Sequence, residues 1–364
     1  IREILLVARP TRLIVDEQSL LHNLDLIKNL ALDQKVIAMV KANAYGCGVE
    51  KIVAILENKV YAFGVSCLEE ALLVRRYSAN TPCILFQGVF SEAELKQAYQ
   101  YGLHLVIHQY QQLVWLLRNP AMQDVNVWVK VNTGMHRLGF LETEVAEVMN
   151  SLAKCAWVAE PIGMLTHLAC ADEINRDNNK KQLEKYLQMT RSYQNILRSV
   201  ANSAAILSDP QTYMDVVRPG VMLYGVSPFT NKSSQECGLL PVMRLVSRVT
   251  EIHDYPAYAE IGYGATWQSD KPSRIGVVPV GYADGYPRCI RSNTSVWVDG
   301  NIVPIVGRIS MDMLTIDLTS CKSVTIGADV ELWGQYISVD EVAAAAGTIG
   351  HEIIARIGSR VIRE

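Results

Sequence analysis

The sequence predicts an α/β fold in which a (β/α)₈ barrel is followed by a mostly antiparallel β domain. Two observations lead to this prediction. Between residues 36 and 225, short apolar runs alternate with helical patterns about eight times, which is the rhythm of parallel strands joined by helices. The rest of the chain shows strands and turns instead. A length of 364 residues has room for a barrel and a second domain.

Each predicted barrel strand is a short apolar run followed by enough residues for a helix. The first helix places Leu20, Leu24 and Ile27 on one face, with Asp16 as its N-cap. An open doubly wound sheet is the alternative, but it usually has a GxGxxG turn after its first strand, and here that strand runs into Lys41. The predicted strands are residues 36–40, 62–65, 84–86, 105–107, 127–131, 162–165, 203–206 and 216–217.

The second domain is predicted to begin after a polar linker at residues 230–235. We therefore expect a barrel domain over residues 1–235, whose first residues can pair with the β domain, and a β domain over residues 236–364. Asp299-Gly300 between two apolar runs is a strong hairpin signal. Further strands are expected at residues 274–280, 305–306 and 314–316, and a single short helix at residues 342–346.

Composition excludes several classes of function. A net charge of −3 without a long basic run lacks the electrostatic footprint of a nucleic-acid binder. No run approaches the roughly 18 apolar residues that a membrane span needs. The eight cysteines include no CxxC pair and the seven histidines no HExxH motif, so no metal site is predicted. Scattered free thiols fit a reduced compartment, and we expect a cytoplasmic protein.

Candidate functional residues follow the predicted barrel strands, where barrel enzymes place their active sites. Lys41 ends the first strand, either as a structural charge or as a desolvated amine for Schiff-base chemistry, with Tyr45 in a polar turn beside it. Lys130 lies inside an apolar strand and needs a neutralising partner or a modification that removes its charge. Arg137 suits a carboxylate or phosphate, and His167 ends a later strand.

The last predicted barrel units contain a phosphate-site candidate. Asn202 and Ser203 lie near one strand, and Arg218 precedes Gly220 and Val221 at another. Backbone N–H groups in this region are suited to hold a phosphate, because barrel phosphate sites usually form after the last strands. Each of these residues has an ordinary structural interpretation when taken alone.

The β domain contains three segments in which polar or phenolic residues stand near glycines that permit tight turns. One carries Tyr263 between Gly262 and Gly264, and another carries Tyr282. The third leads to Met311 and Asp312. A single segment of this kind is best read as turn chemistry, but three in one domain indicate a site.

Taken together, these motifs resemble those of bacterial alanine racemases, which are pyridoxal 5′-phosphate (PLP) enzymes of the barrel class. The resemblance extends from about residue 10 to the C-terminus, with the motifs in the family's order. The matching segments are residues 40–46, 132–139, 165–167, 201–204, 218–225, 262–266, 281–285 and 306–312.

The resemblance implies a two-base racemisation of alanine, which supplies D-alanine for peptidoglycan. Lys41 is implied to carry PLP and to act as one base, and Tyr263 as the other base on the opposite face of the substrate α-carbon. Two bases on opposite faces exchange the α-proton without rotating the substrate. The family is a head-to-tail homodimer in which this tyrosine enters the partner's active site. The implied partners are thus an amino-acid substrate and a second copy of the chain.

The same resemblance assigns the other site residues. Arg218 faces the pyridine nitrogen and His167 supports it, while Arg137 binds the substrate carboxylate or polarises the PLP phenolate. Lys130 matches a position that is often carbamylated, which gives it an anion able to pair with Arg137. The remaining implied cofactor contacts are Tyr45, Asn202, Ser203, Gly220 and Val221; the Met311 backbone also meets the carboxylate, and Tyr282 and Asp312 line the entrance.

Two departures from the family pattern stand out. Cys47 replaces the usual histidine of the KANAYGHG motif, and His351 replaces an entrance tyrosine near the C-terminus. The second change keeps a broader-specificity racemase as the alternative. A PLP-dependent decarboxylase would place an acid where Arg218 stands, and a non-catalytic PLP-binding protein resembles only the barrel.

Overall fold

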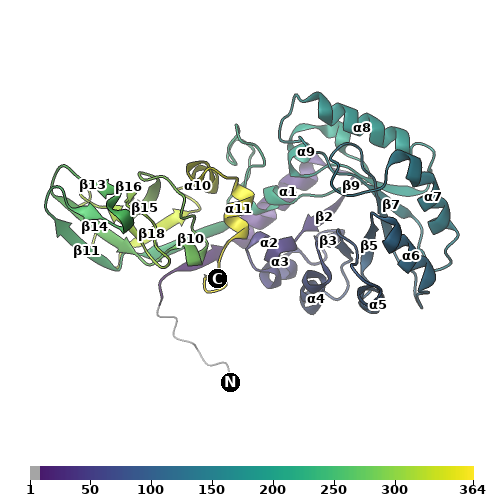
Figure 1. Ribbon diagram of the computed structural model, residues 1–364, viewed down its shortest axis with the longest axis horizontal. Coiled ribbons are helices and arrows are strands. Elements are labelled where there is room, and N and C mark those ends of the chain that lie inside the picture. Colours follow the sequence, from purple (N-terminus) through teal and green to yellow (C-terminus); the bar gives the residue numbers. More distant parts are fainter. Residues whose placement is uncertain (1–8) are drawn as a thin grey trace, which may run out of the picture. The chain divides into compact units, whose positions relative to one another are not determined.

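The computed structural model describes residues 9–364, which divide into two compact units (Figure 1). The barrel unit comprises His22–Leu223 and Pro228–Lys232. The C-terminal unit comprises the preceding residues up to Leu21, Tyr224–Ser227 and Ser233–Glu364. Residues 1–8, which fall within the predicted pairing of the first residues with the β domain, lie outside the described residues.

Eight parallel strands form the predicted barrel. They pair in the order β8-β7-β6-β5-β4-β3-β2-β9. Two hydrogen bonds bridge the gap between β9 and β8. The Ser199 hydroxyl donates to the Val216 carbonyl at 2.7 Å, and the Arg218 N–H donates to the Ala201 carbonyl at 3.0 Å. The strands are β2 (Lys35–Met39), β3 (Ala62–Val65), β4 (Cys83–Leu85), β5 (His104–Ile107), β6 (Val127–Lys130), β7 (Ile162–Leu165), β8 (Ile196–Ser199) and β9 (Val216–Val217).

Helices connect these strands and cover their outer side (Figure 1). The first helix begins as predicted, because the Asp16 carboxylate accepts a hydrogen bond from the Ser19 N–H at 2.7 Å while Leu20, Leu24 and Ile27 are buried. The helices are α1 (Glu17–Leu30), α2 (Lys41–Tyr45), α3 (Val49–Leu56), α4 (Leu68–Tyr77), α5 (Glu92–Gln100), α6 (Tyr110–Arg118), α7 (Glu142–Ala153), α8 (Asp177–Thr190), α9 (Ser203–Ser208), η1 (Pro210–Thr212) and η2 (Val221–Tyr224).

One predicted barrel strand is wrong. Residues 203–206 form the start of helix α9, and the strand of that unit is β8, Ile196–Ser199. The side chain of Asn202 accepts a hydrogen bond from the Ala205 N–H at 3.1 Å, so it caps a helix where a strand was expected. Arg198 interrupts the apolar run of the true strand and hides its periodicity.

The C-terminal unit is built on a nine-stranded, mostly antiparallel sheet. Its order is β11-β14-β17-β16-β15-β18-β10-β1-β19, and β12 and β13 form a separate two-stranded ribbon. The strands are β1 (Arg12–Val15), β10 (Met243–Arg248), β11 (Glu251–Tyr255), β12 (Glu260–Ile261), β13 (Trp267–Gln268), β14 (Ser273–Val278), β15 (Ser295–Val298), β16 (Asn301–Val306), β17 (Leu314–Asp317), β18 (Asp329–Trp333) and β19 (Ile362–Arg363).

The hairpin prediction in this unit is confirmed. Val298 pairs with Asn301, and Asp299 and Gly300 form the two-residue turn with positive φ angles of 44° and 86°. The prediction of a single helix is wrong, because α10 (Val339–Ala346) is followed by α11 (Gly350–Ala355). The shorter helical segments here are η3 (Tyr263–Ala265) and η4 (Tyr282–Asp284).

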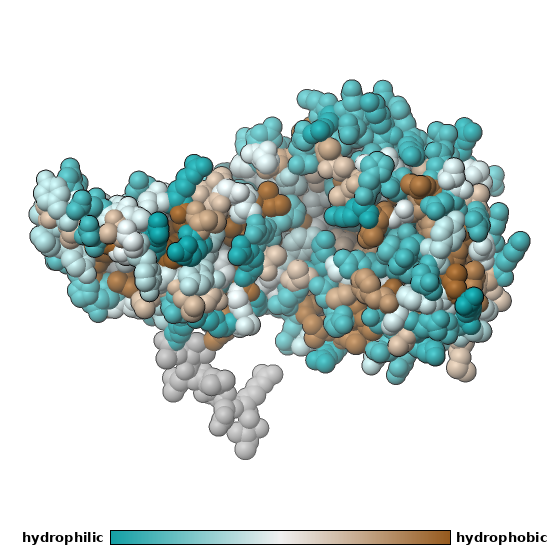
Figure 2. Space-filling model, viewed as in Figure 1, coloured by the Kyte–Doolittle hydropathy of each residue, from teal (hydrophilic) through white to brown (hydrophobic). Residues whose placement is uncertain are grey.

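Hydrophilic side chains are spread over the face seen in Figure 2, with apolar ones in small separate groups. Helix α8 illustrates the pattern, because Leu183, Tyr186 and Met189 are buried while its lysines and acids face outward. No helix in residues 9–364 has the length and apolar character required to cross a membrane.

Candidate active site

Lys41 stands where β2 ends, as predicted, and the turn after it is left-handed. Ala42, Asn43, Ala44 and Tyr45 have φ angles of 52°, 54°, 54° and 52°. The Asn43 side chain accepts a hydrogen bond from the Val49 N–H at 2.9 Å and so holds the end of this turn to α3. Burial, followed by the positive charge of Arg137, lowers the pKa of the Lys41 amine below its ordinary value.

Lys130 is buried at the end of β6 with 9% exposure. Burial lowers the pKa of its amine to about 8, and neighbouring cations contribute in the same direction. These cations are Arg218, Arg137 and Lys41. The Lys130 amine is thus buried among like charges, so the need for a neutralising partner or a modification, inferred from the sequence, remains in the structure.

Arg137 lies on a folded-back loop after β6. The Asn132 side chain accepts hydrogen bonds from the N–H groups of Gly134 at 3.2 Å and His136 at 3.1 Å, and the Phe140 N–H returns to the Lys130 carbonyl at 2.9 Å. Gly139 has φ 115°, and a Cβ there would lie 2.9 Å from the Val131 carbonyl carbon. The loop thus presents the exposed guanidinium of Arg137 from a fixed base.

His167 follows β7 and shares a small pocket with Lys130, Arg137 and Thr166. Burial, followed by the charge of Arg218, holds the pKa of its imidazole well below the usual value. The ring is therefore neutral at neutral pH. Its backbone is held by Gln182 on α8, whose amide nitrogen donates to the His167 carbonyl at 3.1 Å.

Arg218 is buried directly after β9. Its guanidinium donates to the Ser199 hydroxyl at 2.5 Å, the Thr166 carbonyl at 2.5 Å and the Val200 carbonyl at 3.1 Å. Burial lowers the pKa of Arg218 to about 10, which still leaves it charged at neutral pH. Three neutral acceptors thus fix the orientation of a buried cation.

Tyr45, Ser203 and Gly220 form a close-packed group near Arg218. A Cβ at position 220 would lie 2.5 Å from the Tyr45 hydroxyl, so only glycine admits this approach. The Gly220 N–H donates to the Ser203 hydroxyl at 2.8 Å, and Val221 begins the next helical turn. Two hydroxyls beside backbone N–H groups form a donor set that suits a phosphate.

The charge balance of this barrel end points to an anionic ligand. In residues 9–364, none of Lys41, Lys130, Arg137 and Arg218 forms an ion pair with a carboxylate. The pKa of His167 responds to all four of these cations. Buried charges are normally paired, so a ligand carrying phosphate, carboxylate or phenolate groups fits this set.

Tyr263 lies in the C-terminal unit, on the turn between β12 and β13. Its side chain is 70% exposed. Gly262 and Gly264 flank it with φ angles of 79° and 73°, and a Cβ on Gly264 would lie 3.3 Å from the Arg308 guanidinium. Two of the three glycine-flanked segments found in the sequence therefore pack on each other.

The segment that carries Tyr282 packs against the turn that carries Met311 and Asp312. The N–H groups of Tyr282 and Ala283 donate to the carbonyls of Ser310 at 3.1 Å and Met311 at 3.0 Å. Tyr282 and Met311 are exposed by 40% and 52%. These exposed side chains therefore stand on turns that are tied together by backbone hydrogen bonds.

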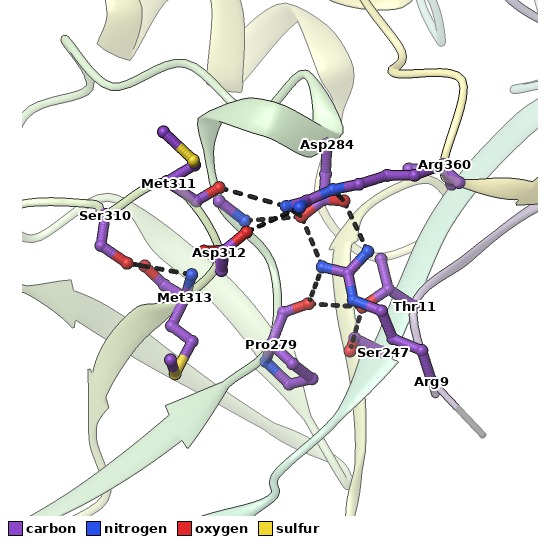
Figure 3. Close-up of polar contacts among 12 residues, drawn as sticks. Arg9, Thr11, Ser247, Pro279, Asp284, Ser310, Met311, Asp312, Met313 and Arg360 are labelled. Atoms are coloured by element: carbon purple, nitrogen blue, oxygen red, sulfur yellow. Dashed lines mark hydrogen bonds and ion pairs between the residues drawn. The ribbon is translucent and has the colours of Figure 1, made fainter.

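A fully buried carboxylate supports these turns from within. Asp284 accepts hydrogen bonds from Arg9 and Arg360, each of which contacts both carboxylate oxygens (Figure 3). Arg360 also donates to the Asp312 carboxylate at 2.6 Å and to the Met311 carbonyl at 3.2 Å. Burial alone would raise the pKa of Asp284, but the two arginines and the Gly281 N–H outweigh it and lower that pKa.

The two family departures occupy different surroundings. Cys47 is fully buried behind the Lys41 turn, where its N–H donates to the Ala44 carbonyl at 3.0 Å. His351 is half-buried on α11.

Three supporting residues were missed by the sequence reasoning. Glu70 accepts a hydrogen bond from the Ala42 N–H, Gln182 holds the His167 backbone, and Asp284 anchors Arg360. Glu70 was only one of several acids at helix starts, and nothing in the sequence marks Gln182 as buried. Asp284 belonged to a recognised motif, but its arginine partners come from distant parts of the chain.

Comparison with known proteins agrees with this geometry. The alanine racemase N-terminal domain model matches residues 15–228, and the alanine racemase C-terminal domain model matches residues 242–364. The alanine racemase of Legionella pneumophila strain Corby is 55% identical over 98% of this chain and 99% of that protein. That of Stutzerimonas stutzeri is 42% identical over the same shares.

Solved structures agree as well. The biosynthetic alanine racemase from Pseudomonas aeruginosa superposes with a TM-score of 0.93 at 41% identity, covering 98% of this chain and 99% of that one. The alanine racemase from Acinetobacter baumannii gives the same values. The resemblance seen in the sequence is thereby confirmed, and the chain belongs to the alanine racemase family.

Proposed function

We propose that this protein interconverts L-alanine and D-alanine with PLP as cofactor, in the cytoplasm, and so supplies D-alanine for peptidoglycan. The observation that carries the proposal is the cluster of Lys41, Lys130, Arg137 and Arg218 at the carboxyl ends of the barrel strands, for which residues 9–364 supply no ion-paired carboxylate. Family membership supports the reaction type.

The residues of the barrel unit fit PLP. Lys41 is the amine that would hold it, and its lowered pKa favours a neutral nucleophile. The phosphate suits the group formed by Tyr45, Ser203 and Gly220, with Val221 and the helix cap Asn202 beside it. Arg218 would face the pyridine nitrogen, supported by His167. When bound, PLP supplies the electron sink for the charge left at the substrate α-carbon.

Proton transfer is assigned to two side chains. The Lys41 amine takes or returns the proton on one face of the α-carbon, and the Tyr263 phenol does so on the other. The pKa of a free phenol lies near 10, so Tyr263 needs activation, which we assign to the neutral His167 and the Arg218 beside it. The 70% exposure of Tyr263 fits a group that reaches into another subunit.

Substrate binding is assigned to residues of both units. Arg137 has no carboxylate partner among the described residues and would bind the substrate carboxylate or polarise the PLP phenolate. The Met311 backbone would also meet the carboxylate, with Tyr282 and Asp312 at the entrance. Carbamylation of Lys130 would turn it into an anion that pairs with Arg137.

The first experiment is α-proton exchange in D₂O followed by NMR, with L-alanine, D-alanine, L-serine and L-lysine. We expect deuterium in both alanine enantiomers together with their interconversion. Lys41→Ala should abolish both the exchange and the PLP absorbance band. A PLP band without exchange on any amino acid would show a PLP binder and not a racemase.

Mixing two inactive variants tests the proposed homodimer. Lys41→Ala and Tyr263→Phe subunits each lack one base, but a mixed dimer contains one complete site if the tyrosine comes from the partner. Random reassociation should then restore about a quarter of wild-type activity, since half of the dimers are mixed and each holds one intact site. Absence of recovery in verified mixed dimers would contradict donation between subunits.

A broader-specificity racemase is the second candidate, and His351 is the observation that favours it. A histidine in place of the entrance tyrosine changes the size and charge of the side chain there. The same exchange assay decides between the two, because comparable rates for serine or lysine and alanine would indicate the broader enzyme. His351→Tyr should then narrow the range.

A further inference from the structure

The turn after Lys41 is conformationally unusual. Four consecutive residues without a glycine, Ala42 to Tyr45, have left-handed backbone angles. In this conformation each Cβ crowds the following carbonyl oxygen, so such residues occur singly and only rarely in succession. Something other than local preference must hold the turn in place.

Glu70 provides that hold. This residue lies in the first turn of α4, which follows β3, the neighbour of β2 in the sheet. One of its carboxylate oxygens accepts from the Ala42 N–H at 2.7 Å, and the other accepts from the Ser66 N–H at 2.8 Å. The two bonds tie the left-handed turn to the loop after the adjacent strand.

Glu70 also contributes charge at this position. It raises the pKa of Lys41, against burial and the charge of Arg137, which lower it. It likewise raises the pKa of Tyr45 on the same turn. The charge of Lys41 helps to lower the pKa values of Lys130 and His167, and the charge of Glu70 helps to raise those of Cys67 and Cys83. Among the described residues, Glu70 is the acid whose charge shifts the pKa of Lys41, opposite to the charge of Arg137.

We propose that Glu70 is a positioning residue for Lys41, which clamps the left-handed turn through the N–H groups of Ala42 and Ser66 and places a carboxylate charge against the turn that begins at Lys41. The proposal rests on the proposed role of Lys41 as the PLP-bearing base. It assigns Glu70 no contact with substrate or PLP.

The first test measures the reactivity of the Lys41 amine in the full-length protein freed of bound aldehyde. Acetic anhydride labelling, read by mass spectrometry between pH 6 and 10, gives the pKa of Lys41, with the exposed Lys180 as internal reference. Glu70→Gln removes the charge and keeps the shape, so the pKa of Lys41 should fall. Labelling at pH 7 should rise about threefold for each half unit of that fall.

Glu69→Gln is the matched control, because it makes the same change at an exposed neighbour on the same helical turn. It should leave the Lys41 labelling curve unchanged. Equal curves for the wild type and Glu70→Gln would overturn the charge role. If the wild type labels as expected but does not racemise alanine, the proposed function fails while the Glu70–Lys41 coupling stands.

The second test addresses the clamp. Glu70→Ala removes both acceptors, and we expect a fall in kcat of tenfold or more and weaker retention of PLP. Adding Ala42→Gly should recover part of both losses, because glycine adopts positive φ without strain. No recovery by Ala42→Gly, with the Lys41 curve also unaltered, would reject the positioning role. If Glu70→Ala does not fold, Glu70→Asp makes the same comparison, since its shorter side chain reaches only one of the two N–H groups.

Discussion

Lys130 is a buried cation that other cations oppose. Its pKa of about 8 makes a substantial share of the amine neutral under mildly alkaline conditions. A neutral amine can attack CO₂, forming an N–C bond and releasing one proton, and the carbamate that results carries a negative charge. The modification thereby removes the repulsion that, after burial, lowers the pKa of the lysine.

We therefore predict that Lys130 is carbamylated and that the modification depends on pH. With ¹³C-labelled bicarbonate, a carbamate NMR signal should be strong at pH 8–9 and decline below pH 8, because protonation of the amine then competes with CO₂. Lys130→Ala should lack the signal and show kcat/KM lower by about tenfold, the worth of one charged hydrogen bond to Arg137. A signal of equal size in Lys130→Ala would place the carbamate elsewhere.

Helix α8 fastens two loops of the candidate site to each other. Gln182 is buried, and its amide nitrogen donates to the Thr133 hydroxyl and the His167 carbonyl, both at 3.1 Å. Its amide oxygen accepts from the Ala169 N–H at 2.8 Å. One side chain thus joins the loop after β6, which carries Arg137, to the loop after β7.

Gln182→Leu is predicted to destabilise the barrel by about 1–3 kcal/mol, because it leaves several polar groups buried without partners. The KM for alanine should rise more than kcat falls, since Arg137 loses its fixed position. Urea unfolding and steady-state kinetics measure the two effects. Gln188→Leu makes the same change on an exposed position of α8 and should affect neither; equal effects in both variants would refute the argument.

The turns of the C-terminal unit depend on Asp284 in a similar way. Asp284→Asn keeps the shape but removes the charge shared by Arg9 and Arg360 (Figure 3). We expect a loss of about 2–3 kcal/mol, below the full cost of breaking a buried pair because both arginines are about one-third exposed. The KM for alanine should also rise, because Arg360, which holds Met311 and Asp312, loses its charged anchor.

Asp329→Asn is the matched control for that prediction. Asp329 pairs with Arg248 on the surface at 3.1 Å, where ion pairs contribute little. The urea midpoint and the KM should stay within error of the wild type. A similar loss in both variants would mean that burial of Asp284 is not what matters.

The elements also show what sequence reasoning can recover. Strands β2 to β7 were predictable because each is a short apolar run, and the hairpin because Asp-Gly is one of the few dipeptides that favour a two-residue turn with positive φ angles. Strand β8 was missed because Arg198 breaks its pattern, and Asn202 was not recognised as the cap of α9. A local pattern suffices to predict an element when its apolar residues or its turn residues determine it. The pattern fails when a polar residue interrupts the element, as Arg198 does in β8.

For the molecule as a whole, the site residues could be located from motifs, but their support could not. The contacts of Glu70, Gln182 and Asp284 join segments that only the fold brings together. The charge excess at the barrel end likewise emerges only when β2, β6 and β9 are neighbours or share one end of the barrel. Local motifs thus indicate the candidate site residues, whereas the residues that position them can be identified only from the topology.

Acid stability is a property of the whole molecule to which the buried histidine His104 should contribute measurably. His104 lies at the start of β5, 9% exposed, and its Nδ1 has no hydrogen-bond partner in the described structure. Burial, followed by the charge of Arg75, lowers its pKa from 6.5 to about 4. Protonation is therefore easier in the unfolded chain than in the folded one.

The sign of the pH effect follows from these two pKa values. The stabilising difference is fully present above pH 6.5 and is lost as the pH falls towards 4, because the unfolded chain gains a proton that the folded chain refuses. At pH 4.5 the resulting loss of folding free energy amounts to about 2–3 kcal/mol, which is a large part of a typical folding free energy. Urea unfolding at pH 7.5 and 4.5 should show a smaller loss for His104→Leu than for the wild type. His253→Leu, at an exposed position of β11, should lose as much as the wild type; an unchanged loss in His104→Leu would assign the acid sensitivity to other groups.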